Sequence, residues 1–256
     1  MIANHGLVED IREYWSHRAE TFDRAFGHGI APGQEAAAWA RPMREHLGPA
    51  PRRVLELACG TGEVTRLIHD LGHDVTGLDF CEPMLAKARA KHAGKPRLRF
   101  VHADAGRTME PDARYDAVVC RHLVWTLTDP PAAFADWVRI LRPGGRLLVY
   151  DGDWTRPAPA GRSAAWILAR WEKFAPDAYY DSAMNARHAS IMQRLPFSEG
   201  LTFDRLSPLL RDAGFAGIRE LSHAPISRAQ RRGQGLRNRL RTLVYRRFIV
   251  LAEKPG

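Results

Sequence analysis

The chain has 256 residues, enough for one large hydrophobic core or for one domain with a lid. Apolar residues make up 45% of it, which is ordinary for a globular protein and excludes a disordered chain. The formal net charge of +9 favours acidic partners such as nucleic acid, anionic lipid or anionic metabolites. The simpler interpretation of that charge is a soluble protein of arginine-rich composition.

The sequence carries no signal for export or membrane insertion. Residues 1–15 contain no apolar stretch after a basic start, and no run of about eighteen apolar residues occurs. The three cysteines, Cys59, Cys81 and Cys120, lack a close pairing spacing, which argues against a disulfide framework and a structural zinc site. We therefore expect a cytoplasmic monomer or homodimer with reduced thiols, no metal and no membrane partner.

The first three-fifths of the chain alternate between strand and helix patterns. Residues 6–26 predict an N-terminal helix, and residues 33–47 a second helix that Pro42 kinks or breaks. Strands are predicted at 53–58, 74–79, 98–102, 115–120 and 145–150, with helices at 63–71, 82–92 and 132–141 between them. This alternation indicates βαβ units and a parallel sheet with right-handed crossovers.

The remainder of the chain breaks the alternation. Residues 152–200 are rich in aromatic residues and punctuated by prolines, which we interpret as a mostly helical insertion. Residues 203–213 return to a helical pattern, and residues 217–221 and 244–252 to strands. Between those strands lies SRAQRRGQGLRNRLR (residues 227–241), and the arginine-rich segment, residues 228–247, contains no acid.

Three successive strand ends offer groups that suit a nucleoside. The first predicted strand ends in a turn that contains Gly60 and Gly62, which allow a ligand to approach the backbone closely. Asp79 ends the second strand, where a carboxylate can accept hydrogen bonds from ribose hydroxyls, and Asp104 follows the third strand. A dinucleotide fingerprint would need a third glycine where Thr65 stands, and no phosphate-binding Gly-Lys-Ser/Thr turn occurs.

These motifs resemble those of the class I S-adenosylmethionine-dependent methyltransferases. VLELACGTGEVT (residues 54–65) resembles their first motif and GLDFCEPMLAKAR (77–89) their second, while HADAG (102–106) resembles the adenine segment and LRPGGRLLVYD (141–151) the strand-five motif. The resemblance covers residues 52–151 closely and the last two strands loosely. It implies a Rossmann-like α/β fold with a seven-stranded, mostly parallel sheet whose last strand is antiparallel, and with helices on both faces.

The resemblance also implies an organisation as a single methyltransferase domain over residues 1–256. N-terminal helices would occupy residues 1–48, the cofactor-binding core residues 52–151, a helical lid over the substrate residues 152–200, and the C-terminal part of the sheet residues 201–256.

The implied cofactor is S-adenosyl-L-methionine, and the resemblance assigns its contacts. Glu56 would lie near the cofactor's amino group, Gly60 and Gly62 would line its methionine and ribose, Asp79 would hold the ribose hydroxyls, and Asp104 would hold the adenine. The remaining expected cofactor contacts are Tyr14, Arg18, Ala58, Phe80, Met84, Ala105 and Arg121.

Methyl transfer from a sulfonium is an in-line displacement with a good neutral leaving group, so the enzyme mainly aligns the reactants. An acceptor that must lose a proton needs a base beside the methyl group. His122, after the fourth strand, is the first candidate, although it could instead only line the methionine end of the cofactor. Asp151 and Asp153, past the fifth strand, are alternatives.

The expected substrate is a small metabolite methylated at nitrogen, oxygen or sulfur. The residues after the fourth strand read CRHL, without the Asn/Asp-Pro-Pro-aromatic signature of methyltransferases that act on nucleic-acid bases. The expected pocket residues are Trp15, Trp125, Trp154, Tyr179 and Tyr180, although the aromatics of the lid could equally form its own core. Two alternatives stay open: an RNA or tRNA methyltransferase that uses residues 228–247, and a non-catalytic cofactor-binding protein.

Overall fold

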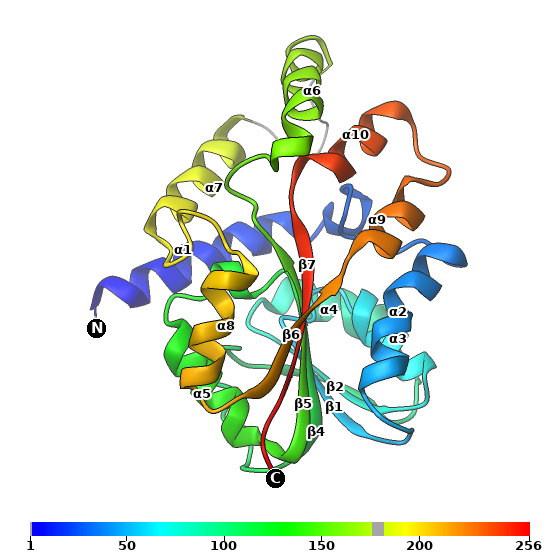
Figure 1. The fold of residues 1–256 in the computed structure, drawn as a ribbon, viewed down its shortest axis with the longest axis vertical. Coiled ribbons are helices and arrows are strands. Elements are labelled where there is room, and N and C mark those ends of the chain that lie inside the picture. Colours follow the sequence, from blue (N-terminus) through cyan, green and yellow to red (C-terminus); the bar gives the residue numbers. More distant parts are fainter. Residues whose placement is uncertain (1, 176–181) are drawn as a thin grey trace.

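A computed structural model of the protein describes residues 2–175 and 182–256. Its strands are β1 (Arg53–Leu57), β2 (Asp74–Asp79), β3 (Leu98–His102), β4 (Tyr115–Arg121), β5 (Leu141–Gly152), β6 (Ala216–Ser222) and β7 (Arg247–Glu253). They form one seven-stranded sheet in the order β3-β2-β1-β4-β5-β7-β6 (Figure 1). The pairs from β3 to β5 are parallel, and β7 runs antiparallel to both β5 and β6. The predicted mostly parallel sheet with an antiparallel last strand is confirmed.

The helices are α1 (Ile2–Arg18), α2 (Gln34–His46), α3 (Glu63–Asp70), α4 (Glu82–Lys91), α5 (Pro130–Ile140), α6 (Arg162–Phe174), α7 (Ser182–Arg194), α8 (Phe203–Asp212), α9 (Ala224–Arg231) and α10 (Leu236–Val244). In Figure 1, α1, α5, α7 and α8 lie on one side of the sheet and α2, α3 and α9 on the other. The predicted arrangement with helices on both faces is therefore confirmed.

Two hydrophobic cores follow from the alternation of side chains along the central strands. Leu55 and Leu57 of β1 point into the core beneath α1, α5 and α8, whereas Val54 points into the core beneath α2 and α3. Both sets are fully buried, which is why these strands read as continuous apolar runs in the sequence. The central strands are thereby held rigidly, and their carboxyl ends are positioned by the cores on either side.

Several predicted boundaries change. The N-terminal helix ends at Arg18 instead of continuing to residue 26, and a short 3₁₀ turn, Phe22–Arg24, follows it. Helix α2 continues through Pro42, because its buried face, which includes Trp39 and Met43, packs against the core and outweighs one missing backbone hydrogen bond.

The C-terminal region contains more helix than the sequence suggested. The arginine-rich segment, for which the sequence predicted no helix, forms the second half of α9 and all of α10. Because α10 continues to Val244, the last strand begins at Arg247 and not at residue 244. Strand β5 begins earlier than predicted, at Leu141, which pairs with Tyr115 across an irregularity in the ladder.

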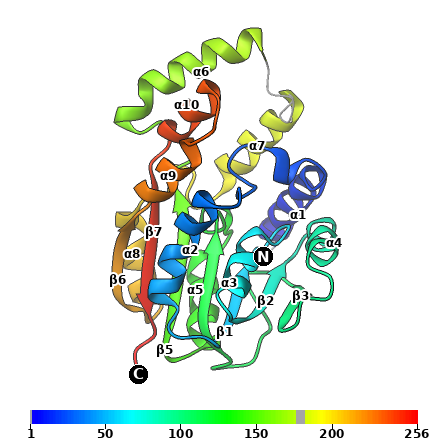
Figure 2. The same ribbon diagram turned by 90° about the vertical axis from the view of Figure 1, so that its right-hand side faces the viewer.

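The insertion of residues 152–200 is mostly helical, as predicted, but its two helices diverge. Helix α7 lies alongside α1, while α6 projects from the body and contacts α10 (Figures 1 and 2). In the part of the chain that the structure describes, no helix combines the length and the apolar character needed to cross a bilayer.

Candidate active site

A cavity of about 280 Å³ lies where the strand order reverses, at the carboxyl ends of β1 and β4. In open α/β sheets ligands bind at this position, because the loops that follow the two neighbouring strands diverge. The structure brings most of the predicted site residues together in its lining: Trp15, Glu56, Ala58, Gly60, Asp79, Phe80, Met84, Asp104, Ala105, Arg121 and His122.

The backbone is strained at the two strand ends that meet in this cavity. Ala58 follows β1 with φ of 52°, and His122 follows β4 with φ of 55°, a left-handed conformation that side chains other than glycine seldom adopt. The His122 amide donates a hydrogen bond of 2.8 Å to the Tyr150 carbonyl of the neighbouring strand, which holds the conformation. Such strain concentrates at functional sites, where the surrounding structure keeps it in place.

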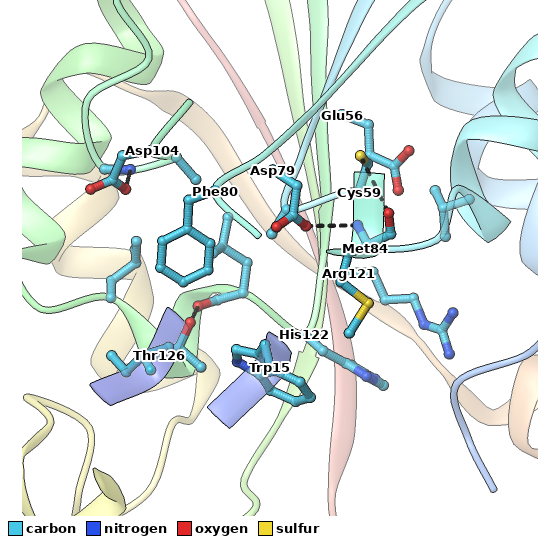
Figure 3. A pocket seen from close by; sticks show the side chains of 18 of the residues that line it. Trp15, Glu56, Cys59, Asp79, Phe80, Met84, Asp104, Arg121, His122 and Thr126 are labelled. Carbon is cyan, nitrogen blue, oxygen red and sulfur yellow. Dashed lines mark hydrogen bonds between the residues drawn. The ribbon is translucent and has the colours of Figure 1, made fainter. Parts of the chain in front are cut away.

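Three acids are arranged in sequence along the cavity. Figure 3 shows Asp104 and Glu56 on opposite sides of the hollow, with Asp79 between them and Phe80 beside Asp79. This is the order in which the adenine, the ribose and the amino acid follow one another in an extended S-adenosylmethionine molecule.

Asp79 joins the ends of β1 and β2. One of its carboxylate oxygens accepts a hydrogen bond of 2.8 Å from the Gly60 amide, and the other accepts one of 2.9 Å from the Cys81 amide. Burial raises the pKa of Asp79 to about 6, although these backbone hydrogen bonds act to lower it. Each oxygen keeps a further lone pair that can accept a hydrogen bond from a ligand hydroxyl.

Glu56 is a buried carboxyl at the other end of the cavity. The Thr65 hydroxyl donates a hydrogen bond to it, so the residue that stands where a dinucleotide fold has glycine contributes to this site. Burial raises the pKa of Glu56 to about 8, while the Thr65 hydroxyl and the Arg121 guanidinium act in the opposite direction. A cationic group beside Glu56 would favour the ionised carboxylate.

The Asp104 end of the cavity is more open. Asp104 is exposed and accepts a hydrogen bond of 2.8 Å from the Gly106 amide, which fixes the turn after β3. The Ala105 carbonyl accepts a buried hydrogen bond of 2.8 Å from the indole N–H of Trp137 on α5. This segment is therefore held in place from both sides, next to the ring of Phe80 (Figure 3).

Comparison with known proteins decides the family. A family model described as a methyltransferase domain matches residues 55–149, from β1 to β5. The demethylmenaquinone methyltransferase of Deinococcus radiodurans is 31% identical over 204 residues, a match that covers 77% of this chain and 80% of that protein. The chain belongs to the S-adenosylmethionine-dependent methyltransferases. Its cofactor is S-adenosyl-L-methionine.

Other similarities are shorter or show only the fold. The ubiquinone/menaquinone biosynthesis C-methyltransferase UbiE of Shewanella halifaxensis is 36% identical over 44% of this chain and 48% of that protein. The chain likewise spans 49% of the demethylmenaquinone methyltransferase of Thermus thermophilus. The structure of phosphoethanolamine N-methyltransferase 2 from Haemonchus contortus with S-adenosylmethionine has a TM-score of 0.60 and 16% identity, covering 93% of this chain and 60% of that chain.

Apolar side chains form part of the lining of the methyltransferase cavity, which we call its apolar compartment. Val8, Ile11 and Trp15 of α1 line it, at spacings of three and four residues that place them on one face of the helix. Further apolar side chains come from the 3₁₀ turn after α1 and from the loop after β4: Phe22, Leu123 and Leu127. An acceptor beside these side chains would contact hydrocarbon and aromatic rings, while Thr126, Thr128 and Asp129 of the loop after β4 add polar groups to the same cavity.

His122 and His28 are the histidines of this compartment. Burial and the neighbouring Arg121 guanidinium hold the pKa of His122 well below its usual range, and they lower the pKa of His28 to about 3. The two rings lie 6.4 Å apart between their centroids, and both line the cavity. Both imidazoles are therefore neutral at physiological pH and can accept hydrogen bonds.

Sequence reasoning missed His28, because it lies in a loop outside every motif. Its position is set by Arg121, which donates a hydrogen bond of 2.9 Å to the His28 carbonyl and another to the Gly27 carbonyl. Because the Arg121 guanidinium donates both hydrogen bonds to this loop, it holds one wall of the cavity in place.

Asp151 does not line the cavity, which counts against the prediction that it acts as a base. The carboxylate is buried and accepts hydrogen bonds of 2.9 Å from the Val124 and Gly152 amides and from the Trp154 indole. Burial raises its pKa to about 7. Asp151 instead fixes the loop that carries His122. Asp153 also lies outside the cavity and accepts hydrogen bonds from Thr155.

Two residues of α1 predicted to contact the cofactor face α7 instead. Tyr14 is buried against His188 with ring centroids 5.5 Å apart, and Arg18 is fully buried and donates a hydrogen bond of 3.6 Å to the Met184 sulfur. Neither lines the cavity, because the helix turns Val8, Ile11 and Trp15 towards it and presents its neighbouring face to α7.

The other expected residues outside the cavity lining are Gly62, Trp125 and Trp154. A side chain at Gly62 would lie 2.8 Å from the His92 ring, so this glycine permits close packing at the turn. Trp125 is buried behind Trp15, and Trp154 packs edge-on against His122 at 4.8 Å. The predicted pocket residues Tyr179 and Tyr180 lie outside the described residues.

Proposed function

We propose that this protein transfers the methyl group of S-adenosylmethionine to a ring carbon of a small, uncharged, hydroxyl-bearing aromatic acceptor of the quinol class. The observation that carries the proposal is the acceptor compartment, where apolar and aromatic side chains surround two neutral histidines. An uncharged ring fills such a site without leaving a charge unpaired. The relatives named for demethylmenaquinone and for C-methylation support a carbon target over the nitrogen, oxygen or sulfur expected from the sequence.

The order of the acids along the cavity supports one orientation of the cofactor. The adenine lies beside Asp104 and Ala105 against Phe80, the ribose hydroxyls bind Asp79, and the amino group lies beside Glu56. Phe80 and Met84 of the cavity lining would flank the adenine face. In this orientation His122 and Trp15 would lie on the side of the cavity to which the cofactor presents its methyl group.

The transfer needs no reactant besides the cofactor and the acceptor. Partial loss of the phenolic proton raises the electron density of the neighbouring ring carbon, which attacks the methyl carbon. As the new carbon–carbon bond forms, the carbon–sulfur bond breaks and its electron pair stays on sulfur, which gives S-adenosylhomocysteine. The methylated carbon then loses its ring proton to water, and the ring becomes aromatic again. The cavity contributes mainly by aligning the ring with the methyl group.

His122 accepts a hydrogen bond from the acceptor hydroxyl in this scheme. Because its pKa lies well below the usual range, the imidazole stays neutral and does not become a cation next to the positive sulfonium. The hydrogen bond orients the hydroxyl and increases the negative character of its oxygen. His28, on the opposite wall, offers a second position for a ring oxygen.

Methyl transfer from radiolabelled cofactor into a cell extract tests the class of acceptor. We expect the label in ring compounds that partition into organic solvent, and we expect it only when the extract has been reduced, since a quinone carries no hydroxyl. Label in RNA, in protein or in water-soluble amines would overturn the proposal. RNA is included because the arginine-rich helices α9 and α10 are the feature expected of an RNA-modifying enzyme.

A further inference from the structure

Helix α6 exposes apolar side chains on the face that points away from the protein. Trp166 is 68% exposed, Ile167 40% and Phe174 82%. Trp166 and Ile167 are adjacent, and Phe174 follows them by eight and seven residues, which places all three on one side of the helix. The opposite side, with Ala164 and Leu168, is buried against Val244 of α10. Helix α6 therefore carries a second apolar face, opposite to the face that packs on α10.

Helix α10, which packs against α6, also exposes two apolar side chains. Leu236 is 62% exposed and Leu243 46%, and they lie two helical turns apart on the side of α10 that faces solvent. Figure 2 shows α6 lying across the end of the molecule beyond α10, at the end towards which β5 points. Isolated exposed apolar residues are ordinary, but a group on two adjoining helices marks a surface that binds something.

Positive charges accompany the apolar side chains. Arg170 and Lys173 are exposed on α6 at helical spacings from Trp166, and Arg239 is exposed between Leu236 and Leu243 on α10. The acid of α6, Glu172, forms ion pairs with Arg237 and Arg241 of α10. No acid occurs between Glu220 and Glu253. This end of the molecule is therefore positive, and the negative charge nearest to the exposed apolar side chains is already compensated.

We propose that α6 and α10 dock this protein on the surface of an anionic lipid bilayer. Helices with basic residues beside tryptophan, phenylalanine and leucine lie in the plane of the headgroups, with the apolar side chains inserted and the cations held near anionic lipids. The expectation of no membrane partner rested on the absence of a spanning segment, and that absence does not bear on binding at the membrane surface. The proposal rests on the surface alone and does not depend on the identity of the methyl acceptor.

A bilayer fits this surface better than RNA does. RNA would bind the arginines through its phosphates and could stack a base on Trp166, but it offers nothing to Ile167, Leu236 and Leu243. A bilayer takes up both the cations and the aliphatic side chains. Of these two partners, only the bilayer accounts for the exposed aliphatic side chains.

Flotation with lipid vesicles tests the proposal on the full chain. We expect the protein to float with vesicles that contain phosphatidylglycerol and to stay unbound with phosphatidylcholine alone. Trp166→Ala/Phe174→Ala should weaken partitioning by about tenfold or more. Arg170→Gln/Lys173→Gln should weaken it by roughly fivefold for each charge, and added salt should weaken binding of the wild type.

Matched controls remove similar groups elsewhere. Met109→Ala deletes an apolar side chain that is 75% exposed between β3 and β4, and Arg44→Gln/Arg211→Gln deletes two exposed charges on α2 and α8. Both should float like the wild type.

Failure of the wild type to float with anionic vesicles, or equal losses in controls and α6 variants, would overturn the proposal. Binding to transfer RNA that needs Arg170 and Lys173 but not Trp166 and Phe174, without flotation, would also overturn it. Flotation involves no methyl transfer, so its outcome is independent of the proposed reaction.

Discussion

Glu56→Gln keeps the shape of the side chain beside the proposed position of the cofactor's amino group and removes its charge. The carboxyl is buried, and burial raises its pKa to about 8, so it is mostly protonated near neutral pH before the cofactor binds. A cationic ammonium group favours the ionised form, and cofactor binding should therefore release a proton. The variant cannot make this exchange.

The expected magnitude follows from the loss of a charged hydrogen bond. Such a bond contributes about 1.5–3 kcal/mol, so the variant should bind the cofactor roughly ten- to a hundredfold more weakly. In the wild type, affinity should rise with pH by about tenfold per pH step below the pKa and level off above about 8. The variant should show a flat profile across the same range.

Titration calorimetry in buffers of different ionisation enthalpy measures both affinity and proton release. We expect about one proton released per cofactor by the wild type near neutral pH and none by Glu56→Gln. Thr65→Val provides the matched variant: its missing hydroxyl removes a hydrogen bond that lowers the pKa of Glu56, so the affinity profile should shift to higher pH. A Glu56→Gln protein that binds as tightly as the wild type, or a wild type that releases no proton, would refute this reasoning.

Four further results are expected. Asp79→Ala should weaken cofactor binding by roughly ten- to a hundredfold and also lower the melting temperature, because the carboxylate accepts two backbone hydrogen bonds; unchanged calorimetric affinity would count against its role. His122→Ala should slow turnover more than it raises KM, by about a hundredfold if the hydroxyl hydrogen bond matters, and the wild-type rate should show no imidazole titration between pH 6 and 8 because the His122 pKa lies lower. Cys59 should react slowly with alkylating agents even without cofactor, since burial raises its thiol pKa; fast labelling in mass spectrometry would contradict this. The melting temperature of the cofactor-free protein should fall as pH rises from 6.5 to about 8. The reason is that folding raises the pKa of Asp151 to about 7 and that of Glu56 to about 8, so the stability that the protonated carboxyls contribute is lost as they ionise. An unchanged or rising melting temperature would contradict those directions.

The cofactor half of the site could be predicted from the sequence because its residues stand at strand ends. Asp79 ends β2 and Asp104 follows β3, and the carboxyl ends of neighbouring parallel strands meet at one edge of the sheet, whereas the role of Glu56, inside β1, came from the family resemblance. Once the strands were located, topology alone placed these side chains together. The prediction needed no knowledge of contacts between distant parts of the chain.

The acceptor half could not be predicted in this way. His28 reaches the cavity through hydrogen bonds to Arg121, 93 positions further along the chain, and no local pattern encodes such a contact. Composition indicated that residues 152–200 were helical and aromatic but not where the rings point. Trp166 and Phe174 turned out to face solvent, and α1 supplies the wall that the insertion was expected to form.

The same limit explains the prediction for Asp151. Its place at the carboxyl end of β5 suits a base, yet the carboxylate is turned towards the amides of Val124 and Gly152 and the Trp154 indole. The direction of a side chain at a strand end depends on which donors surround it in the folded protein. Periodicity along the chain carries no information on that point.

Transfer of an isotope-labelled methyl group to a purified, reduced naphthoquinol that has a free ring position tests the central claim most directly. Nuclear magnetic resonance of the product distinguishes a methyl group on ring carbon from one on oxygen. We predict a ring-carbon methyl signal and S-adenosylhomocysteine in equal amounts, with the rate strongly reduced in His122→Ala. No transfer to the quinol while the same preparation methylates an amine or transfer RNA, or a methyl group found on oxygen, would contradict the account.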